Sequence, residues 1–278
     1  MTTPAAVRVP ILMYHEIAGR AETASRLAVP PANFAAQLDY LRSAGFTAMT
    51  AAELSARLAD GIGPLPDRPI VLTFDDGYAD FHSRAMPLLD RHGFTATLFV
   101  TTGWEQDAGL RRSAPGRMLN RTQLAEAAAA GVEIAAHTRS HPQLDQLPER
   151  LVREELGASK RWLEDEIGLA VPGLAYPFGY SNARVRQVAR EAGYRYAHAV
   201  DNATASQRAD PFAVPRLTVR RATTLPEFRR LVDGQTTLRL LEDRALTRGW
   251  SVVRQIRAAR RASTTCAIMR TPGLCALL

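Results

Sequence analysis

The stretch Ile70-Val-Leu-Thr-Phe-Asp-Asp-Gly-Tyr78 joins a short apolar run to two adjacent carboxylates and a glycine. An apolar run of this length, bounded by turn residues, is typical of a strand that is buried on both faces of a parallel sheet. The change to Asp75 and Asp76 places polar side chains just past the end of that strand. In parallel α/β folds, active sites assemble at this end of the strands.

Three further predicted strands end in polar residues in the same way. They are Pro10-Ile-Leu-Met-Tyr-His-Glu16, Val132-Glu-Ile-Ala-Ala-His-Thr-Arg-Ser-His141 and Leu174-Ala-Tyr-Pro-Phe-Gly179. Because the carboxyl ends of parallel strands meet at one face, we expect the residues that follow these four strands to converge on one site.

The rest of the chain alternates short apolar runs with amphipathic helical patterns, which predicts an α/β fold with parallel strands. About seven such alternations fit a barrel or a doubly wound sheet, and periodicity alone does not separate the two. The other predicted strands are Ala96–Thr101, Tyr194–Val200 and Phe212–Val219. The predicted helices are Pro31–Ala44, Ala52–Leu58, Ala79–His92, Thr122–Ala130, Pro148–Ile167 and Asn182–Ala192.

Composition excludes several classes of protein. The 278 residues are 46% hydrophobic and 23% charged, which is the balance of a globular protein with a sizeable core. No apolar run approaches the ~20 residues of a membrane-spanning helix. The first ten residues show no basic region followed by an apolar run, so the sequence predicts a cytoplasmic protein. Its two cysteines, Cys266 and Cys275, imply no disulfide framework.

The net charge of +7 comes from the C-terminal part of the chain. From Arg216 onward there are 13 Arg and 4 Asp or Glu, a balance of +9. We therefore divide the chain into a catalytic domain at 1–236 and an arginine-rich helix and tail at 237–278. A solvated helix face explains the arginines better than a nucleic-acid or acidic lipid surface, because no aromatic residues are interleaved. No nucleic-acid partner is expected.

A metal site is the strongest chemical prediction. On one helical turn, His137 and His141 would share a face, so both imidazoles could reach one ion. With an aspartate from another strand end, they form a two-nitrogen, one-oxygen set with open positions, as in catalytic metal sites. The adjacent residues Asp75 and Asp76 point in different directions, so one can bind metal while the other takes a proton. A simple Asp-Asp-Gly turn is the alternative.

A histidine can protonate a leaving group near neutral pH. His15 follows a predicted strand and is the preferred candidate for this role. His198 competes for it, but it falls inside a predicted strand, where burial is expected.

The motifs Thr73-Phe-Asp-Asp-Gly77, His137-Thr-x-Ser-His141 and Tyr176-Pro-Phe-Gly179 resemble, in order and spacing, those of the polysaccharide deacetylases, the NodB-like carbohydrate esterases of family four. The resemblance covers roughly Val9 to Val219. It implies a distorted (β/α) barrel of about seven strands. It also implies Asp75 as general base and Asp76, His137 and His141 as ligands of Zn²⁺ or another divalent metal. Tyr176, Pro177, Phe178 and Gly179 would then form the substrate and oxyanion segment.

The chain departs from the common family pattern in three places. Ala175 stands where many members have arginine, the usual late Leu-x-His is absent unless Tyr196-Ala-His198 replaces it, and no Asp-x-x-x-Trp follows Gly179. The Met-Tyr-His opening instead resembles a subset related to poly-N-acetylglucosamine deacetylases, in which the acid-bearing segment lies at the front. This resemblance implies His15 as the general acid. Arg216 is a candidate to replace the missing arginine beside Asp75.

The expected activity is metal-dependent removal of acetyl from an N-acetylated carbohydrate or glycoside of the N-acetylglucosamine type. A small glycoside or natural-product intermediate, in place of a polymer, is the alternative substrate. A non-catalytic protein that binds through its basic C-terminus is a third hypothesis. Tyr78, Tyr176, Phe178 and Trp104 are candidates to line a sugar groove, although ordinary core packing is the alternative. The sequence does not indicate the oligomeric state.

Overall fold

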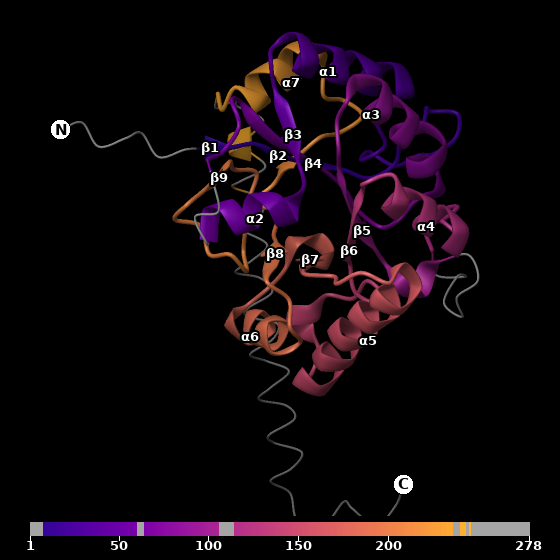
Figure 1. Ribbon diagram of the computed structural model, residues 1–278, viewed down its shortest axis with the longest axis vertical. Helices are drawn as coiled ribbons and strands as arrows, with labels where there is room; N and C mark the ends of the chain where they lie inside the picture. The colour runs from indigo at the N-terminus through magenta and orange to yellow at the C-terminus, as the bar shows by residue number, and fades with distance from the viewer. Residues whose placement is uncertain (1–7, 60–63, 106–113, 236–239, 243–244, 246–278) are drawn as a thin grey trace, which may run out of the picture.

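A parallel sheet that curls into an open barrel forms the centre of the molecule (Figure 1). The computed structural model describes residues 8–59, 64–105, 114–235, 240–242 and 245. Along the sheet the strands are β10 (Leu217–Thr218), β2 (Ile11–Tyr14), β4 (Pro69–Phe74), β5 (Thr97–Val100), β6 (Glu133–Ala136), β7 (Gly173–Ala175) and β8 (Tyr196–His198). A further strand, β3 (Thr47–Met49), pairs with the first half of β4. Strands β1 (Arg8–Val9) and β9 (Ala205–Ser206) form a separate antiparallel pair.

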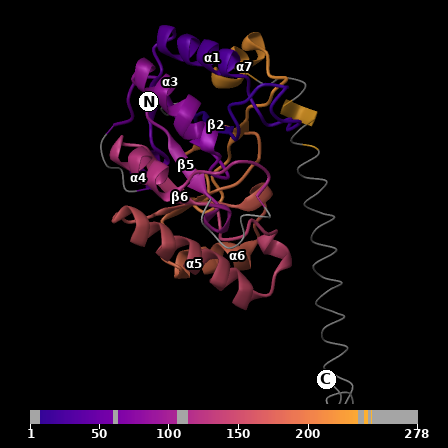
Figure 2. The ribbon, with the colours of Figure 1, turned by 90° about the vertical axis from the view of Figure 1, so that its right-hand side faces the viewer.

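Helices cover the outside of this sheet (Figures 1 and 2). Those that follow the strands are α1 (Pro31–Ser43), α3 (Met86–His92), α4 (Arg121–Ala129), α5 (Glu149–Ile167) and α6 (Ala183–Glu191). A π-helical segment, η1 (Phe81–Ala85), precedes α3, and α7 (Leu225–Val232) packs beside α1. The predicted (β/α) barrel is confirmed, and the expected helices agree with these elements to within a few residues.

The alternation of side chains along each strand decides which residues enter the barrel. In β4, Ile70, Leu72 and Phe74 belong to the large apolar core with residues of the outer helices, whereas Val71 belongs to the smaller inner cluster. Because successive side chains point to opposite faces, Asp75 continues the inner face. In β6 the same alternation puts Ala135 in the inner cluster and continues to His137.

Helix α2 (Ala51–Ala59) covers the end of the barrel where β5 and β6 begin. The backbone N–H of Ala51 donates to Thr97 Oγ1 over 2.9 Å, and that of Ala52 donates to Glu133 Oε2 over 3.0 Å. These side chains satisfy N–H groups in the first turn of the helix, which has no earlier carbonyls to bond. The opposite end, where the strands finish, is left for the polar residues.

Several predicted features differ from the structure. The strand expected at Phe212–Val219 is limited to Leu217–Thr218, and β3, β9 and α7 were not predicted. Strands β3 and β9 have three and two residues, which is too short for a periodic signal. Helix α7 has eight residues, and the capping box of Thr224 and Glu227 is the sequence signal that could have identified it. The predicted boundary at 236/237, and almost all of the basic helix and tail, lie outside the described residues. Among the described helices, none combines the length and apolar character needed to cross a membrane.

Candidate active site

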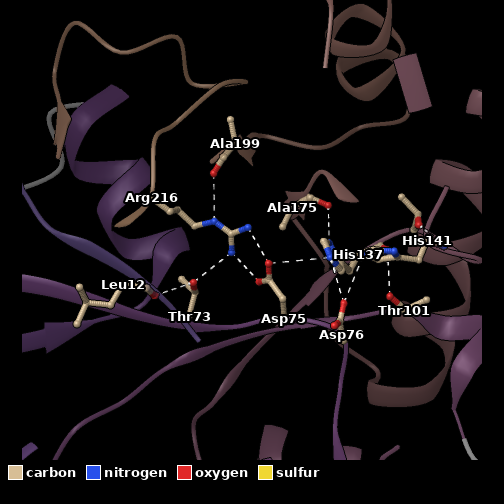
Figure 3. A network of polar contacts seen from close by, with 11 residues as sticks. Leu12, Thr73, Asp75, Asp76, Thr101, His137, His141, Ala175, Ala199 and Arg216 are labelled. Atoms are coloured by element: carbon tan, nitrogen blue, oxygen red, sulfur yellow. Dashed lines mark hydrogen bonds and ion pairs between the residues drawn. The ribbon is translucent and has the colours of Figure 1, made fainter. Parts of the chain in front are cut away.

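A buried ion pair fixes the carboxylate that follows β4 (Figure 3). Arg216 Nη1 lies 2.6 Å from Asp75 Oδ1, and Nη2 lies 2.7 Å from Oδ2. The Arg216 and Asp75 side chains are 0% and 3% exposed. Arg216 also donates to Thr73 Oγ1 and to the carbonyl of Ala199. Arg216 therefore lies beside Asp75, as expected for the residue that replaces the arginine missing at position 175, and it binds Asp75 as a bidentate pair.

The same ion pair decides the charge of Asp75. Burial alone would raise the pKa of Asp75, but the Arg216 guanidinium, with His137 in addition, holds that pKa well below its ordinary range. The carboxylate is therefore ionised at neutral pH. It can accept a proton, and it lies 4.0 Å from His137 Nε2 (Oδ2 to Nε2) at the edge of the histidine cluster.

Asp76 turns the other way because of its backbone. Its φ is 76° and that of Gly77 is 88°, so two consecutive left-handed residues end β4. Aspartate tolerates this conformation better than most side chains, and glycine adopts it freely. A Cβ at Gly77 would also lie 3.3 Å from Val100 Cγ1. The two neighbouring carboxylates are thereby separated, one toward Arg216 and the other toward the histidines.

The two histidines are not on a helical turn, so that premise of the sequence analysis is wrong. His137 continues β6 and is followed by a non-helical turn in which Thr138 has φ 68° and His141 has φ 58°. The turn is closed by the His141 N–H, which donates to Thr138 Oγ1 over 3.0 Å. Two left-handed residues therefore bring the imidazoles together, with ring centroids 4.9 Å apart.

Asp76, His137 and His141 form a three-donor cluster. Asp76 Oδ1 lies 3.5 Å from His137 Nε2 and 3.4 Å from His141 Nε2, and all three donor atoms lie within 4.8 Å of one another. His137 Nδ1 lies 2.8 Å from the Ala175 carbonyl, which fixes the tautomer that leaves Nε2 free to bind. Burial lowers the pKa of both histidines, that of His141 to about 3, so both imidazoles are neutral.

The chemistry of this cluster fits a divalent cation. Asp76 Oδ1 is buried without a hydrogen-bond partner, and burial together with the negative charge of Asp75 raises the Asp76 pKa to about 8. A buried carboxylate without a partner is costly unless a cation compensates it. Two neutral imidazoles and one carboxylate are the donor set of catalytic metal sites.

Glu155, on α5, holds the turn that carries His141. Its Oε2 accepts the backbone N–H groups of Arg139 and Ser140 over 2.9 and 2.8 Å, and its Oε1 accepts the Ser140 hydroxyl over 2.5 Å. The sequence did not indicate Glu155, because its contacts join residues 15 and 16 positions apart and it looks like one more acidic residue on an amphipathic helix.

The two candidate acids lie in different surroundings. His15 follows β2 and is partly exposed, with Nδ1 buried without a hydrogen-bond partner. Burial lowers the pKa of His15 to about 4, and Asp75 and Arg216 both act on it electrostatically. His198 is 1% exposed and lies between Phe99 and Tyr196, with ring centroids 5.6 and 5.4 Å away. His15 is therefore the candidate that solvent reaches.

The predicted substrate segment divides into buried and exposed residues. Tyr176 and Pro177 are buried, and the Tyr176 hydroxyl donates to the Phe212 carbonyl, so the Tyr176 side chain belongs to the core. Phe178 is 51% exposed, has φ 60° and lies 4.7 Å from the His141 ring. A Cβ at Gly179 would lie 2.6 Å from the Val200 backbone nitrogen, so this turn requires glycine.

Aromatic side chains line the three-donor cluster on two sides. Trp104 is 8% exposed and packs against His141 with ring centroids 4.9 Å apart, which makes it a support for that imidazole. Phe178 stacks on the half-buried Tyr180 with ring centroids 5.7 Å apart, and the Phe178 ring is the exposed aromatic surface beside the site. Of the four candidates for a sugar groove, Phe178 alone is well exposed.

Glu155→Ala is expected to weaken divalent-metal binding by about 10–100-fold, because the turn that presents His141 loses its three acceptor contacts. Titration calorimetry with Zn²⁺ measures this directly. Glu155→Gln keeps an acceptor and is expected to lose less. Asp165→Ala removes an exposed carboxylate elsewhere on α5 and serves as the control. An unchanged affinity in Glu155→Ala would contradict the positioning role.

A family profile and the similar proteins of known sequence indicate the same family. Residues 62–197 match the family profile of polysaccharide deacetylase. The Bacillus subtilis (strain 168) protein YxkH, whose name assigns it to the polysaccharide deacetylases, is 28% identical over 212 residues, 76% of this chain and 71% of that protein. A poly-beta-1,6-N-acetyl-D-glucosamine N-deacetylase of Staphylococcus aureus is 22% identical over 166 residues, which span 56% of each protein.

Solved structures show the same fold. The Streptococcus pyogenes deacetylase PplD, solved in complex with acetate, superposes with a TM-score of 0.73 at 25% identity and covers 84% of this chain and 100% of that structure. Residues 62–197 therefore form a domain of the polysaccharide deacetylase family, a family of hydrolases that act on N-acetyl amide bonds.

Proposed function

We propose that this protein hydrolyses the N-acetyl group of a glucosamine-type unit in a polysaccharide and releases acetate and a free amine. One observation carries the proposal: an ionised carboxylate, Asp75, lies at the edge of a separate cluster of Asp76, His137 and His141. Amide hydrolysis needs a base for the attacking water and a positive charge near the carbonyl oxygen. Asp75 supplies the base, and the cluster that contains Asp76 holds the cation that supplies the positive charge.

Asp75 is the proposed general base. Both of its oxygens are held by Arg216, so its orientation is fixed before substrate binds. A depressed pKa makes it a weak base at rest. The low pKa keeps the Asp75 carboxylate in the form that accepts a proton. The pair with Arg216 also fixes its side-chain rotamer, so no rotational entropy is lost when the substrate binds. The proton that Asp75 takes from water is then available to His15.

Asp76, His137 and His141 are the proposed ligands of the metal. When bound, a divalent cation supplies Lewis-acid polarisation at this point of the site. Zn²⁺ is our expectation, because catalytic zinc sites combine imidazole and carboxylate donors and keep an open position. The Phe178 backbone N–H is the proposed second donor to the carbonyl oxygen, since the Phe178 ring lies beside His141.

His15 is the proposed general acid. Its pKa of about 4 means that the imidazole is neutral at pH 7, so it donates only after it has gained a proton during turnover. Asp75 is the charged group that favours the protonated form of His15, and the proton lost by the attacking water is the nearest source. His198 has no such access, because it is buried between two rings.

A sugar polymer is the proposed substrate class. The exposed Phe178 ring beside His141, stacked on the half-buried Tyr180, offers a flat apolar surface that suits the C–H face of a pyranose ring. The named activity of the S. aureus relative, deacetylation of a poly-N-acetylglucosamine, supports the same class.

The purified protein loaded with Zn²⁺ is expected to release acetate from N-acetylglucosamine oligomers, and a chelator is expected to stop the release. Acetate is measured enzymatically across β-1,4- and β-1,6-linked oligomers and small N-acetylated glycosides. Activity on the small glycosides alone would show that the substrate is a small glycoside and not a polymer. No release from any compound by a metal-loaded protein would refute the proposed function.

His15→Gln is expected to slow acetate release from an amide more than from an aryl acetate, because a phenolate leaves without being protonated. We expect a loss of about 10²–10⁴-fold on the amide. His198→Gln is the matched control and should slow both substrates equally. Equal slowing of both substrates by His15→Gln would contradict its role as the acid.

A further inference from the structure

A cavity of about 330 Å³ adjoins the metal-ligand cluster, and the proposed mechanism does not use it. Its lining includes Glu16, Tyr78, Asp80, Arg84 and Gly116. Glu16 directly follows His15, and Tyr78 comes two residues after Asp76. The negative charge of Glu16 acts on Asp76 itself, so the cavity and the cluster are close in space. Cavities of this size bind small molecules in other proteins.

Tyr78 brings an unsatisfied hydroxyl to this cavity. The residue is 7% exposed, and its ring packs with Trp104 and Met118. Its hydroxyl forms no hydrogen bond with any residue in the described part of the chain. The Tyr78 hydroxyl is therefore available to bond a ligand in the cavity that Tyr78 lines.

Two carboxylates in the cavity lack a cation. Glu16 is 8% exposed and accepts from the Thr23 hydroxyl, and Asp80 accepts the Ile17 N–H. Burial raises the pKa of both, that of Asp80 to about 6. Within the described ranges neither forms an ion pair.

In the described part of the chain no basic residue forms an ion pair with Glu16 or Asp80, although Arg84 acts on Asp80 electrostatically. Arg84 is held by Glu22 through both terminal nitrogens, one of them at 2.8 Å. Arg117 also lines the cavity but is exposed, and Arg221 acts on Glu16 electrostatically. The cavity therefore presents a negative charge that no described residue pairs directly.

We propose that this cavity is a subsite for a sugar unit that carries a free amino group, next to the acetylated unit in the active site. The inference rests on the proposed function, because the reaction itself produces such units, and their amines are ammonium ions in neutral water. The ammonium group fits the uncompensated carboxylates, and the Tyr78 hydroxyl can bond a sugar hydroxyl. The enzyme then acts faster on chains that are already partly deacetylated.

The test compares kcat/KM for two oligomers of N-acetylglucosamine, one fully acetylated and one with a single free amine beside the acetylated unit. Wild-type protein is expected to prefer the amine-bearing oligomer by about tenfold, the effect of one charge-assisted hydrogen bond. Asp80→Asn still accepts the Ile17 N–H but has no charge, so this preference should fall toward one. The control Glu154→Gln, on α5, should retain the preference.

A second variant probes the space without changing the charge. A Cβ on Gly116 would lie 3.2 Å from Tyr78 Cε1 and 3.9 Å from Glu16 Oε1, so Gly116→Ala reduces the room in the cavity. Gly116→Ala is also expected to lose the preference for the amine-bearing oligomer. A wild-type preference of one or less, or an unchanged preference in Asp80→Asn, would overturn the inference.

Direct binding separates this inference from the proposed function. Titration calorimetry with a glucosamine oligomer is expected to give binding to the wild type that is weakened at least tenfold in Asp80→Asn. Binding with no acetate release from any oligomer would refute the deacetylase proposal and keep the cation-binding cavity. Release of acetate with no binding of the glucosamine oligomer would refute the cavity and keep the deacetylase.

Discussion

The bidentate pair between Arg216 and Asp75 is the interaction on which the site depends. It joins the end of β4 to the segment before β10, which are 141 residues apart. Both partners are buried, and breaking such a pair by removing one partner typically costs ~3–5 kcal/mol. Arg216 also bonds Thr73 and Ala199, so one guanidinium connects three segments of the barrel. Its charge keeps Asp75 ionised although the surroundings of Asp75 exclude water.

A second constraint is the backbone at the strand ends. Asp76, Thr138, His141 and Phe178 all have positive φ, and all four lie at or beside the three-donor cluster. Non-glycine residues in this conformation cost free energy and persist where the surrounding structure enforces them. Here the enforcing contacts are the acceptors of Glu155 and the Thr138 hydroxyl. The strain separates Asp76 from Asp75 and brings His141 toward His137.

The amino-acid sequence predicted the features that local pattern controls. The apolar run before Asp75 and the alternation in β6 predict the strands, and the ends of those strands predict where the polar residues converge. The turn at 137–141 was predicted as helical because His-x-x-x-His spacing does not distinguish a helical turn from a left-handed one. Glu155 and the cavity near Tyr78 could not be predicted, since both depend on contacts between distant segments. Arg216 was proposed only because a resemblance left a place for an arginine.

The central claim is the division of labour between two adjacent aspartates. The most direct measurement is the metal content and the rate of acetate release of Asp75→Asn, in which the asparagine can still accept from Arg216. The account predicts about one equivalent of metal, as in the wild type, and a rate that falls by about 10²–10⁴-fold. A rate close to that of the wild type, or a protein that no longer holds metal, would contradict it.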